Sequence, residues 1–275
     1  MEKKYYRCSC SFGKDSLALL LKLIELKMPL DEVVFYDTGM EFEAIYNIRD
    51  RVKKLLQENN IKYIELKPKC EMYYSMFEKI INAGKPNEHK GYSWCGGCTR
   101  WGTTEKLQAL EKYGKNCIDY VGIAGDEWKR LEAIFEFDME TYKDKNGKEK
   151  KRPLLNENGC IQNYRQIAKF NKKYPLVEWN MNEQDCLKYC HDKGFYWWEN
   201  DIELYSILDR VSCWCCANKN LTELRNYWLY LPKYWEMLKN FQRKTDRPFK
   251  PNLTIFDLED MFEMGYIPRS KKHKS

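Results

Sequence analysis

At 275 residues and 43% apolar content, the chain is long enough for one large α/β domain, or for such a domain with a helical appendage, with a core of its own. The first ten residues carry charges without an apolar core, and no stretch approaches about 18 uninterrupted apolar residues. We therefore expect neither export nor a membrane span, and we place the chain in the cytoplasm. The 47 basic and 41 acidic residues give a formal charge of +6, which suits phosphate-rich partners but does not by itself indicate nucleic acid.

Strands and helices are predicted to alternate over the first half of the chain. Apolar and β-branched runs predict strands, and leucine and isoleucine residues at helical spacing, as between Leu17 and Ile24, predict helices. This alternation predicts an α/β fold with a parallel twisted sheet, helices on both faces and a ligand site at the C-terminal ends of the strands. The expected strands cover residues 5–10, 33–39, 61–66 and 117–125, and the expected helices cover residues 15–27, 43–59 and 103–113.

The pattern changes in the second half. Residues 140–152 are highly charged and contain Asn146-Gly147, which favours an exposed hairpin or loop. From about residue 183 the spacing is mainly helical, with many tryptophans and tyrosines. We therefore divide the chain into an α/β domain at 1–135, an insertion and return to the sheet at 136–182, and a helical, cysteine-containing C-terminal region at 183–275.

The segment Ser11-Phe12-Gly13-Lys14-Asp15-Ser16 lies where a predicted strand is followed by a helix. There the backbone N–H groups of the helix N-terminus can bind a phosphate, Gly13 allows close approach, and Lys14 adds positive charge. The Ser11 and Ser16 hydroxyls can donate hydrogen bonds, and Asp15 can cap the helix or help to place Mg²⁺. The alternative is an ordinary turn in which Asp15 or Ser16 is the helix N-cap.

This segment resembles the PP-loop, usually S-G-G-x-D-S, and Phe12 in second place is similar to the variant of phosphoadenosine phosphosulfate reductases. Further segments resemble that family in the same order, and together they span most of the chain. They are residues 36–42, 98–106, 122–130 (with Ala124 where the family often has Arg), 175–185 and 204–205. The chain thus resembles the phosphoadenosine phosphosulfate reductase-like branch of the PP-loop pyrophosphatase superfamily. In this reading, residues 1–135 are a PP-loop nucleotide-binding domain.

The resemblance implies a pocket for ATP or an adenylyl sulfate nucleotide, with Mg²⁺. Taken alone, each charged residue implied in this pocket is more simply a solvated surface residue. The residues implied to bind the nucleotide are Ser11, Phe12, Gly13, Lys14, Asp15, Ser16, Asp37, Thr38, Gly39, Glu41, Gly122 and Arg130. Those implied near the phosphates or the substrate are Arg100, Lys106, Asp126 and Glu127, and the candidate catalytic residues are Lys14, Asp15 and Cys215.

Twelve cysteines in a long chain without an export signal favour metal binding or catalysis over disulfides. Cys95-Gly96-Gly97-Cys98 is a C-x-x-C knuckle, and Cys213-Trp214-Cys215-Cys216 contains a second one. Two such pairs can complete a four-sulfur site for zinc or an iron–sulfur cluster, with Cys95, Cys98, Cys213 and Cys216 as ligands. Resemblance to adenylyl-sulfate-specific reductases implies a [4Fe-4S] cluster, zinc is the alternative, and two groups of buried reduced thiols are the structural alternative.

Three functions remain open. The first is an ATP pyrophosphatase that adenylates an acceptor for sulfur transfer, as the thiolation enzymes of the superfamily do, with a sulfur donor such as a cysteine desulfurase. The second is a sulfonucleotide reductase; no cysteine follows Cys216 in this sequence, whereas the reductases have a cysteine in a C-terminal E-C-G-[I/L]-H tail. The third is a non-catalytic nucleotide-binding module. A tRNA or DNA substrate and a homodimer are further expectations, and no membrane partner is expected.

Overall fold

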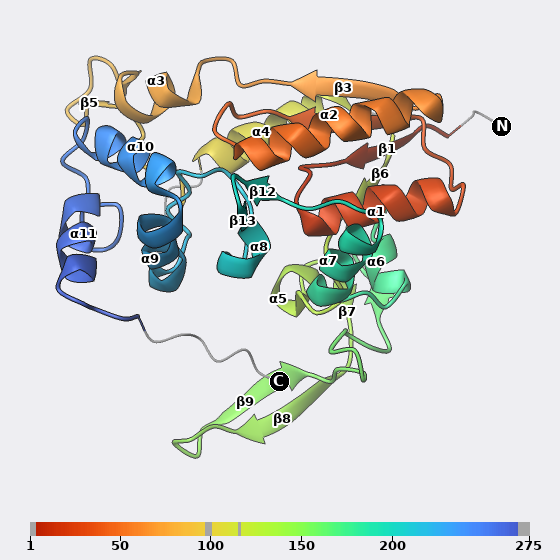
Figure 1. The fold of residues 1–275 in the computed structure, drawn as a ribbon. Coiled ribbons are helices and arrows are strands. Elements are labelled where there is room, and N and C mark those ends of the chain that lie inside the picture. The colour runs from red at the N-terminus through yellow and green to blue at the C-terminus, as the bar shows by residue number, and fades with distance from the viewer. Residues whose placement is uncertain (1–3, 97–100, 115–116, 269–275) are drawn as a thin grey trace. The chain divides into compact units, whose positions relative to one another are not determined.

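A computed structural model of the protein describes residues 4–96, 101–114 and 117–268, and it contains a five-stranded sheet in the order β11-β6-β1-β2-β3 (Figure 1). The sheet is parallel, with Cys8 of β1 beside Val33 of β2 on one side and Tyr120 of β6 on the other. This confirms the predicted parallel α/β fold. The strands are β1 (Tyr6–Ser9), β2 (Glu32–Tyr36), β3 (Lys62–Leu66), β6 (Ile118–Val121) and β11 (Lys172–Lys173).

Helix α1 (Lys14–Glu25) connects β1 to β2, and α2 (Glu43–Glu58) connects β2 to β3. Since β1, β2 and β3 are successive neighbours joined by right-handed crossovers, both helices lie on one face of the sheet (Figure 1). Helix α1 buries Leu17, Leu19 and Leu20 completely, and α7 (Glu183–Asp192) packs along it. Burial of about three leucines contributes several kcal/mol of hydrophobic stabilisation.

The chain forms two compact units, each with its own core. The first contains Met1–Phe35, Asn47–Glu65 and Gly114–Tyr196; the second contains Tyr36–Tyr46, Leu66–Tyr113 and Trp197–Ser275. The three-part division at residues 135 and 182 stays a prediction. No helix in the described ranges is long and apolar enough to cross a membrane.

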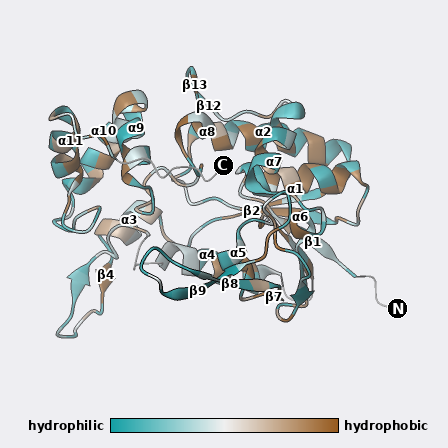
Figure 2. Cartoon of the chain, turned by 90° about the horizontal axis from the view of Figure 1, so that it is seen from below, coloured by the Kyte–Doolittle hydropathy of each residue, from teal (hydrophilic) through white to brown (hydrophobic). Residues whose placement is uncertain are grey.

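The first unit also contains the segment between β6 and α7. Here the charged residues near Asn146-Gly147 form the antiparallel hairpin β8–β9, coloured as hydrophilic in Figure 2, so the predicted hairpin is confirmed. Its turn spans residues 144–148, with Gly147 at φ 76°. The elements are α5 (Trp128–Leu131), β7 (Phe135–Glu136), β8 (Met139–Lys143), β9 (Glu149–Pro153), β10 (Arg165–Gln166) and α6 (Pro175–Glu178).

The second unit is mainly helical, and aromatic rings fill its core, as when the Trp94 ring lies 4.7 Å from Phe249 and the Trp214 ring 4.9 Å from Phe241. Such pairs stabilise a core beyond their buried area. Its elements are α3 (Met72–Phe77), β4 (Ile80–Ile81), β5 (His89–Lys90), α4 (Trp101–Tyr113), β12 (Trp198–Glu199), β13 (Ile202–Glu203), α8 (Leu204–Ile207), α9 (Leu221–Tyr230), α10 (Pro232–Gln242) and α11 (Ile255–Glu263).

A buried ion pair joins two central strands. Arg7 of β1 lies opposite Asp119 of β6, and its Nε and Nη2 donate to the two carboxylate oxygens at 2.5 and 2.8 Å. The residues are 2% and 7% exposed. A side chain at Gly114 would overlap the guanidinium, since an added Cβ would lie 1.5 Å from Nη1. The pair therefore fixes the β1–β6 register at the edge opposite the phosphate loop.

We expect Arg7→Met or Asp119→Leu alone to destabilise the protein by about 3–5 kcal/mol, because each leaves one buried charge without its partner. The double variant is expected to recover most of that loss, because no unpaired charge remains. Urea unfolding of the four proteins measures both effects. Losses that simply add in the double variant would show that the two charges do not depend on each other.

Candidate functional site

The loop between β1 and α1 is built to leave a helix N-terminus open. Gly13 is the N-cap residue, and no side chain caps the first turn. The Ser16 hydroxyl instead donates to the Gly13 carbonyl at 3.1 Å and accepts the Ser11 backbone N–H at 3.2 Å, which ties the loop together from within. The first N–H groups of α1 have no intrahelical partner, so they can bind an anion.

Phe12 supports this loop from below. Its backbone has φ 58°, its side chain is completely buried, and its ring centre lies 5.0 Å from that of Phe35 in β2. In this loop the phenylalanine therefore has the positive φ, whereas the glycine that follows it, Gly13, has φ −75°. Packing of the Phe12 ring compensates for this backbone strain, so the phenylalanine anchors the loop rather than contacting solvent.

Strand β6 ends against this loop at Gly122. An added Cβ there would lie 2.9 Å from Ser16 Cα and 3.1 Å from the Ser16 backbone nitrogen. Only a residue without a side chain lets the strand end approach the first turn of α1 this closely. The chain then continues through Gly125, whose N–H donates to the Met181 carbonyl at 2.8 Å, and this places residues 126 and 127 beside the loop.

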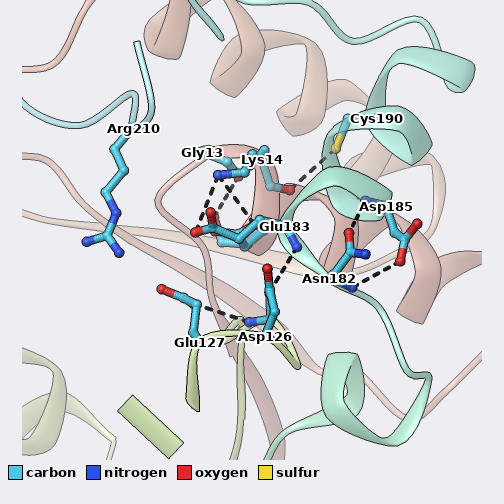
Figure 3. Close-up of polar contacts among 12 residues, drawn as sticks. Gly13, Lys14, Asp126, Glu127, Asn182, Glu183, Asp185, Cys190 and Arg210 are labelled. Atoms are coloured by element: carbon cyan, nitrogen blue, oxygen red, sulfur yellow. Dashed lines mark hydrogen bonds and ion pairs between the residues drawn. The ribbon is translucent and has the colours of Figure 1, made fainter. Parts of the chain in front are cut away.

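Three carboxylates gather around Lys14. Asp15, Glu127 and Glu183 each offer one oxygen, and these oxygens all lie within 4.8 Å of one another. The ammonium group of Lys14, 4% exposed, lies 3.6 Å from Glu183 and 4.0 Å from Asp15 (Figure 3). Arg130 donates to both oxygens of Glu127 at 2.7 Å. The cluster thus combines cations that can bind phosphate with oxygens that can bind a divalent cation.

Asp15 is the member under most electrostatic strain. Burial raises its pKa to about 7, the nearby Lys14 lowers it, and Glu183 and Glu127 raise it further. Its Oδ1 atom is buried and accepts no hydrogen bond from any described residue. A buried carboxylate oxygen without a donor is destabilising unless a cation or proton occupies its lone pairs. The donor set and this oxygen therefore fit Mg²⁺.

Glu183 was not expected from the sequence. It is the first residue of α7, which begins with a capping box between Asn182 and Asp185, and its backbone N–H donates to Asp126 at 3.1 Å. Burial raises the pKa of that Asp126 carboxyl. The Asn-x-x-Asp capping pattern could have indicated the helix start and hence an acidic residue at its N-terminus.

In the second unit, the segment after β2 forms a compact polar turn. Asp37 Oδ1 accepts the Gly39 N–H and the Tyr46 hydroxyl, both at 2.8 Å. Thr38 donates to Glu41 at 2.9 Å, and burial raises the pKa of Glu41 while the charge of Lys106 on α4 lowers it. Asp37, Thr38, Gly39, Glu41 and Lys106 are therefore neighbours within this unit, and their role in nucleotide binding stays a prediction. Arg100 lies outside the described residues.

The two cysteine segments are also neighbours within this unit. The Ala217 N–H donates to the Cys95 carbonyl at 3.1 Å, and a side chain at Gly96, which has φ 140°, would meet the backbone nitrogens of Ala217 and Asn218. The Trp214 N–H donates to the Met40 carbonyl at 2.9 Å, which links the second cysteine segment to the Asp37–Glu41 turn. Cys98 lies outside the described residues.

The thiols themselves interact. A hydrogen bond to Cys215 raises the pKa of Cys213, a hydrogen bond to Cys213 raises that of Cys216, and burial raises that of Cys95. Cys215 is completely buried. The sulfurs of Cys95, Cys213 and Cys216 are not all within 4.8 Å of one another, since among the described residues only the carboxylate group meets that limit.

Comparison with known proteins agrees with this geometry. The pattern of the phosphoadenosine phosphosulfate reductase domain matches residues 6–195. The chain belongs to this family. Its members belong to the PP-loop superfamily, bind nucleotides and are generally enzymes, and the loop at residues 11–16 lies within the matched region.

Individual relatives match more weakly. The uncharacterized protein MJ0066 of Methanocaldococcus jannaschii is 26% identical over 252 residues, 88% of this chain but 42% of that protein. The adenosine 5'-phosphosulfate reductase of Staphylococcus saprophyticus is 43% identical over 54 residues, 20% of this chain and 22% of the reductase. The corresponding reductase of Staphylococcus epidermidis is 30% identical over 80 residues, 29% of this chain and 32% of the reductase. The chain therefore spans less than half the length of each of these relatives.

The close approach at Gly122 generates a graded prediction. Gly122→Ala is expected to weaken nucleotide binding about tenfold, because the added Cβ must push the first turn of α1 by a few tenths of an ångström, and Gly122→Val is expected to weaken it further. Calorimetric titration with ATP and with adenylyl sulfate measures the affinities, and circular dichroism checks the fold. Equal affinity of all three proteins would show that this contact does not position the loop.

Proposed function

We propose that the protein is a PP-loop enzyme that binds ATP with Mg²⁺ and adenylates an acceptor for sulfur transfer. An oxygen of the acceptor attacks the α-phosphorus, the bond to the β-phosphate oxygen breaks, and pyrophosphate leaves. A nucleophile at the oxidation level of sulfide then displaces AMP, so the sequence requires no change of redox state. The acceptor is an oxygen-bearing group that becomes a thiocarbonyl or thiol.

The cluster of three carboxylates, from Asp15, Glu127 and Glu183, is the main observation behind this proposal. Three carboxylates beside a phosphate loop would repel a polyphosphate that arrives without a cation, because like charges in a half-buried site repel strongly. Mg²⁺ bound there would neutralise the carboxylates and the charge that develops on the departing pyrophosphate. Asp15, Glu127 and Glu183 would hold the ion, with Asp15 supplying the buried oxygen that accepts no hydrogen bond within the described ranges.

The residues of the chain contribute directly as well. Lys14 is held near Asp15 and Glu183, so it can turn toward a phosphate oxygen without becoming solvated. The N–H groups of the first turn of α1 would bind the phosphates, and the Ser11 and Ser16 hydroxyls, 3.1 Å apart, would keep the loop in shape. Glu127 and Asp126 hold this edge together through Arg130 and the Glu183 N–H.

A sulfonucleotide reductase is the second candidate, favoured by the family and by the local similarity to adenosine 5'-phosphosulfate reductases. The two candidates differ in their products. An adenylating enzyme releases AMP and pyrophosphate from ATP, whereas a reductase releases sulfite and AMP from adenylyl sulfate with a thiol as the electron donor. A protein that binds nucleotide and forms neither set of products would be a non-catalytic module.

The three-carboxylate cluster predicts how an isosteric substitution of one of its members changes activity. Asp15→Asn is expected to lower Mg²⁺-dependent AMP formation from ATP at least 100-fold, about 2.7 kcal/mol of transition-state stabilisation, while the thermal midpoint does not fall. Asp192→Asn, at an exposed position on α7, is the matched control and should retain full activity. Sulfite from adenylyl sulfate, with no AMP from ATP, would replace this proposal with the reductase.

The cysteine site is expected to hold a [4Fe-4S] cluster that serves sulfur chemistry, bound by Cys95, Cys98, Cys213 and Cys216. Cys215 lies between Cys213 and Cys216 in the sequence, and its side chain is completely buried. We propose that it tunes the reactivity of the Cys213 thiol through the hydrogen bond between them. Such a cluster would supply inorganic sulfide and bound iron for the sulfur-transfer step.

Anaerobic purification followed by iron, zinc and acid-labile sulfide analysis tests the cysteine site. We expect iron with sulfide and a broad visible absorbance, both lost in Cys213→Ser. Cys160→Ser, which changes a buried thiol of the other unit, should retain them. Stoichiometric zinc without iron would indicate a structural zinc site. The adenylation proposal would then depend on the phosphate loop alone.

A further inference from the structure

The β8–β9 hairpin concentrates the basic charge of the protein. Residues 138–173 contain ten basic and five acidic residues, an excess that nearly equals the +6 of the whole chain. Both strands have five residues and expose most of their side chains to solvent. Figure 1 shows the hairpin extending away from the sheet of its own unit.

The two faces of the hairpin differ in how their charges are used. Side chains alternate along a strand, so Glu140, Tyr142, Lys150 and Arg152 share one face. There Arg152 pairs with Glu140 at 2.6 Å and lies 5.1 Å from the centre of the Tyr142 ring, and Lys150 pairs with Asp144 at 2.8 Å. This face is electrostatically satisfied from within and stiffens the ribbon.

The opposite face and the turn carry unmatched lysines. Thr141 lies opposite Lys151 and Lys143 opposite Glu149, while Lys145 and Lys148 extend the row around the turn. Lys143, Lys145, Lys148 and Lys151 are all exposed, and none forms an ion pair with another described residue. Four exposed lysines on one face and at the turn of a two-stranded ribbon can neutralise phosphates of a polyanion.

A second basic segment continues this surface at the base of the hairpin. Met139 of β8 lines one groove, about 520 Å³ in volume, together with Arg165 and Ile167, so the segment after β10 lies beside the hairpin. This segment exposes Lys169 and Phe170, the latter 76% exposed. The basic surface of the hairpin therefore continues to the point where the ribbon joins the rest of its unit.

We propose that the β8–β9 ribbon is a docking arm for double-stranded DNA. Charge complementarity favours a polyanion, and an antiparallel ribbon of two strands fits the major groove of B-DNA, which is about 12 Å wide. The major groove of an RNA duplex is deep and narrow and would not admit it. The inference rests on the proposed function, for which it names the class of acceptor: a group on a DNA duplex.

The test measures binding separately from catalysis. A fluorescent duplex of about 20 base pairs, two turns of B-DNA, is titrated with the full chain. The titration is repeated from about 50 to about 200 mM salt. The ribbon variant combines Lys143→Gln, Lys145→Gln, Lys148→Gln and Lys151→Gln. The matched control combines Lys4→Gln, Lys54→Gln, Lys62→Gln and Lys188→Gln, four exposed lysines of the same unit.

The wild-type chain is expected to bind with a dissociation constant in the micromolar range at the lowest salt. The ribbon variant is expected to bind at least tenfold more weakly, with a salt slope lower by up to about 3.6, because four phosphate contacts are lost and each releases about 0.9 counterion. The dissociation constant of the control variant should stay within about threefold of the wild-type value at each salt concentration. Equal binding by the ribbon and control variants, or no salt-dependent binding by the wild type, would overturn the proposal.

Two further arms separate the alternatives. A folded tRNA that displaces the duplex at equal nucleotide concentration would assign the surface to RNA and overturn the commitment to DNA. Basal AMP formation from ATP should be the same in the ribbon variant and the wild type, because none of the four lysines lies at the phosphate loop. If the wild-type chain binds the duplex but forms no AMP from ATP, the proposed function is rejected and the docking arm still stands.

Discussion

The contact between the end of β6 and the first turn of α1 is the constraint on which the candidate site depends. Backbone meets backbone there because residue 122 has no side chain, and a Cβ would lie 2.9 Å from Ser16 Cα. The strand register set by the buried Arg7–Asp119 pair fixes where β6 ends, and the next turn then delivers Asp126 and Glu127 to the phosphate loop. One missing side chain and one buried ion pair thus control the geometry of groups more than a hundred residues apart in sequence.

The electrostatics of the loop follow from that geometry. An open helix N-terminus with one lysine would bind many anions with little selectivity. Three carboxylates within 4.8 Å of one another would change this preference under the proposed function, because they would repel a bare anion and favour one that arrives with a divalent cation. Burial raises the pKa of Asp15 to about 7, and under the proposed function a bound divalent cation would offset the cost of its charged form. The same gathering of negative charge would make the loop selective for a metal-bound polyphosphate under the proposed function.

Local sequence signals predicted the elements of the sheet well and the site in part. Apolar runs and helical spacing identified the strands and helices around the phosphate loop, because each depends on its own residues and their periodicity. Glu183 was missed because its role comes from α7 packing along α1, a contact between residues about 170 positions apart. The positive φ fell on Phe12 rather than Gly13 because burial of an aromatic ring against Phe35 outweighed the backbone preference, which local propensity does not report. For the cysteines, spacing predicted the pairs, and the adjacency of Cys95 to Ala217 required the fold.

Whole-chain charge was a weak guide for a related reason. An excess of six basic residues among 275 is ordinary, yet most of that excess lies in the 36 residues around one hairpin. Association with a polyanion depends on the potential of the surface that meets it, and that potential decays over a Debye length of about 10 Å at 0.1 M salt. Charges elsewhere on the chain therefore contribute little to such an encounter. One face of the ribbon pairs its charges internally and stiffens it, while the other face and the turn carry lysines that form no ion pair with a described residue. Charge is thus used for structure on one face and is available for recognition on the other, a division that depends on the strand register.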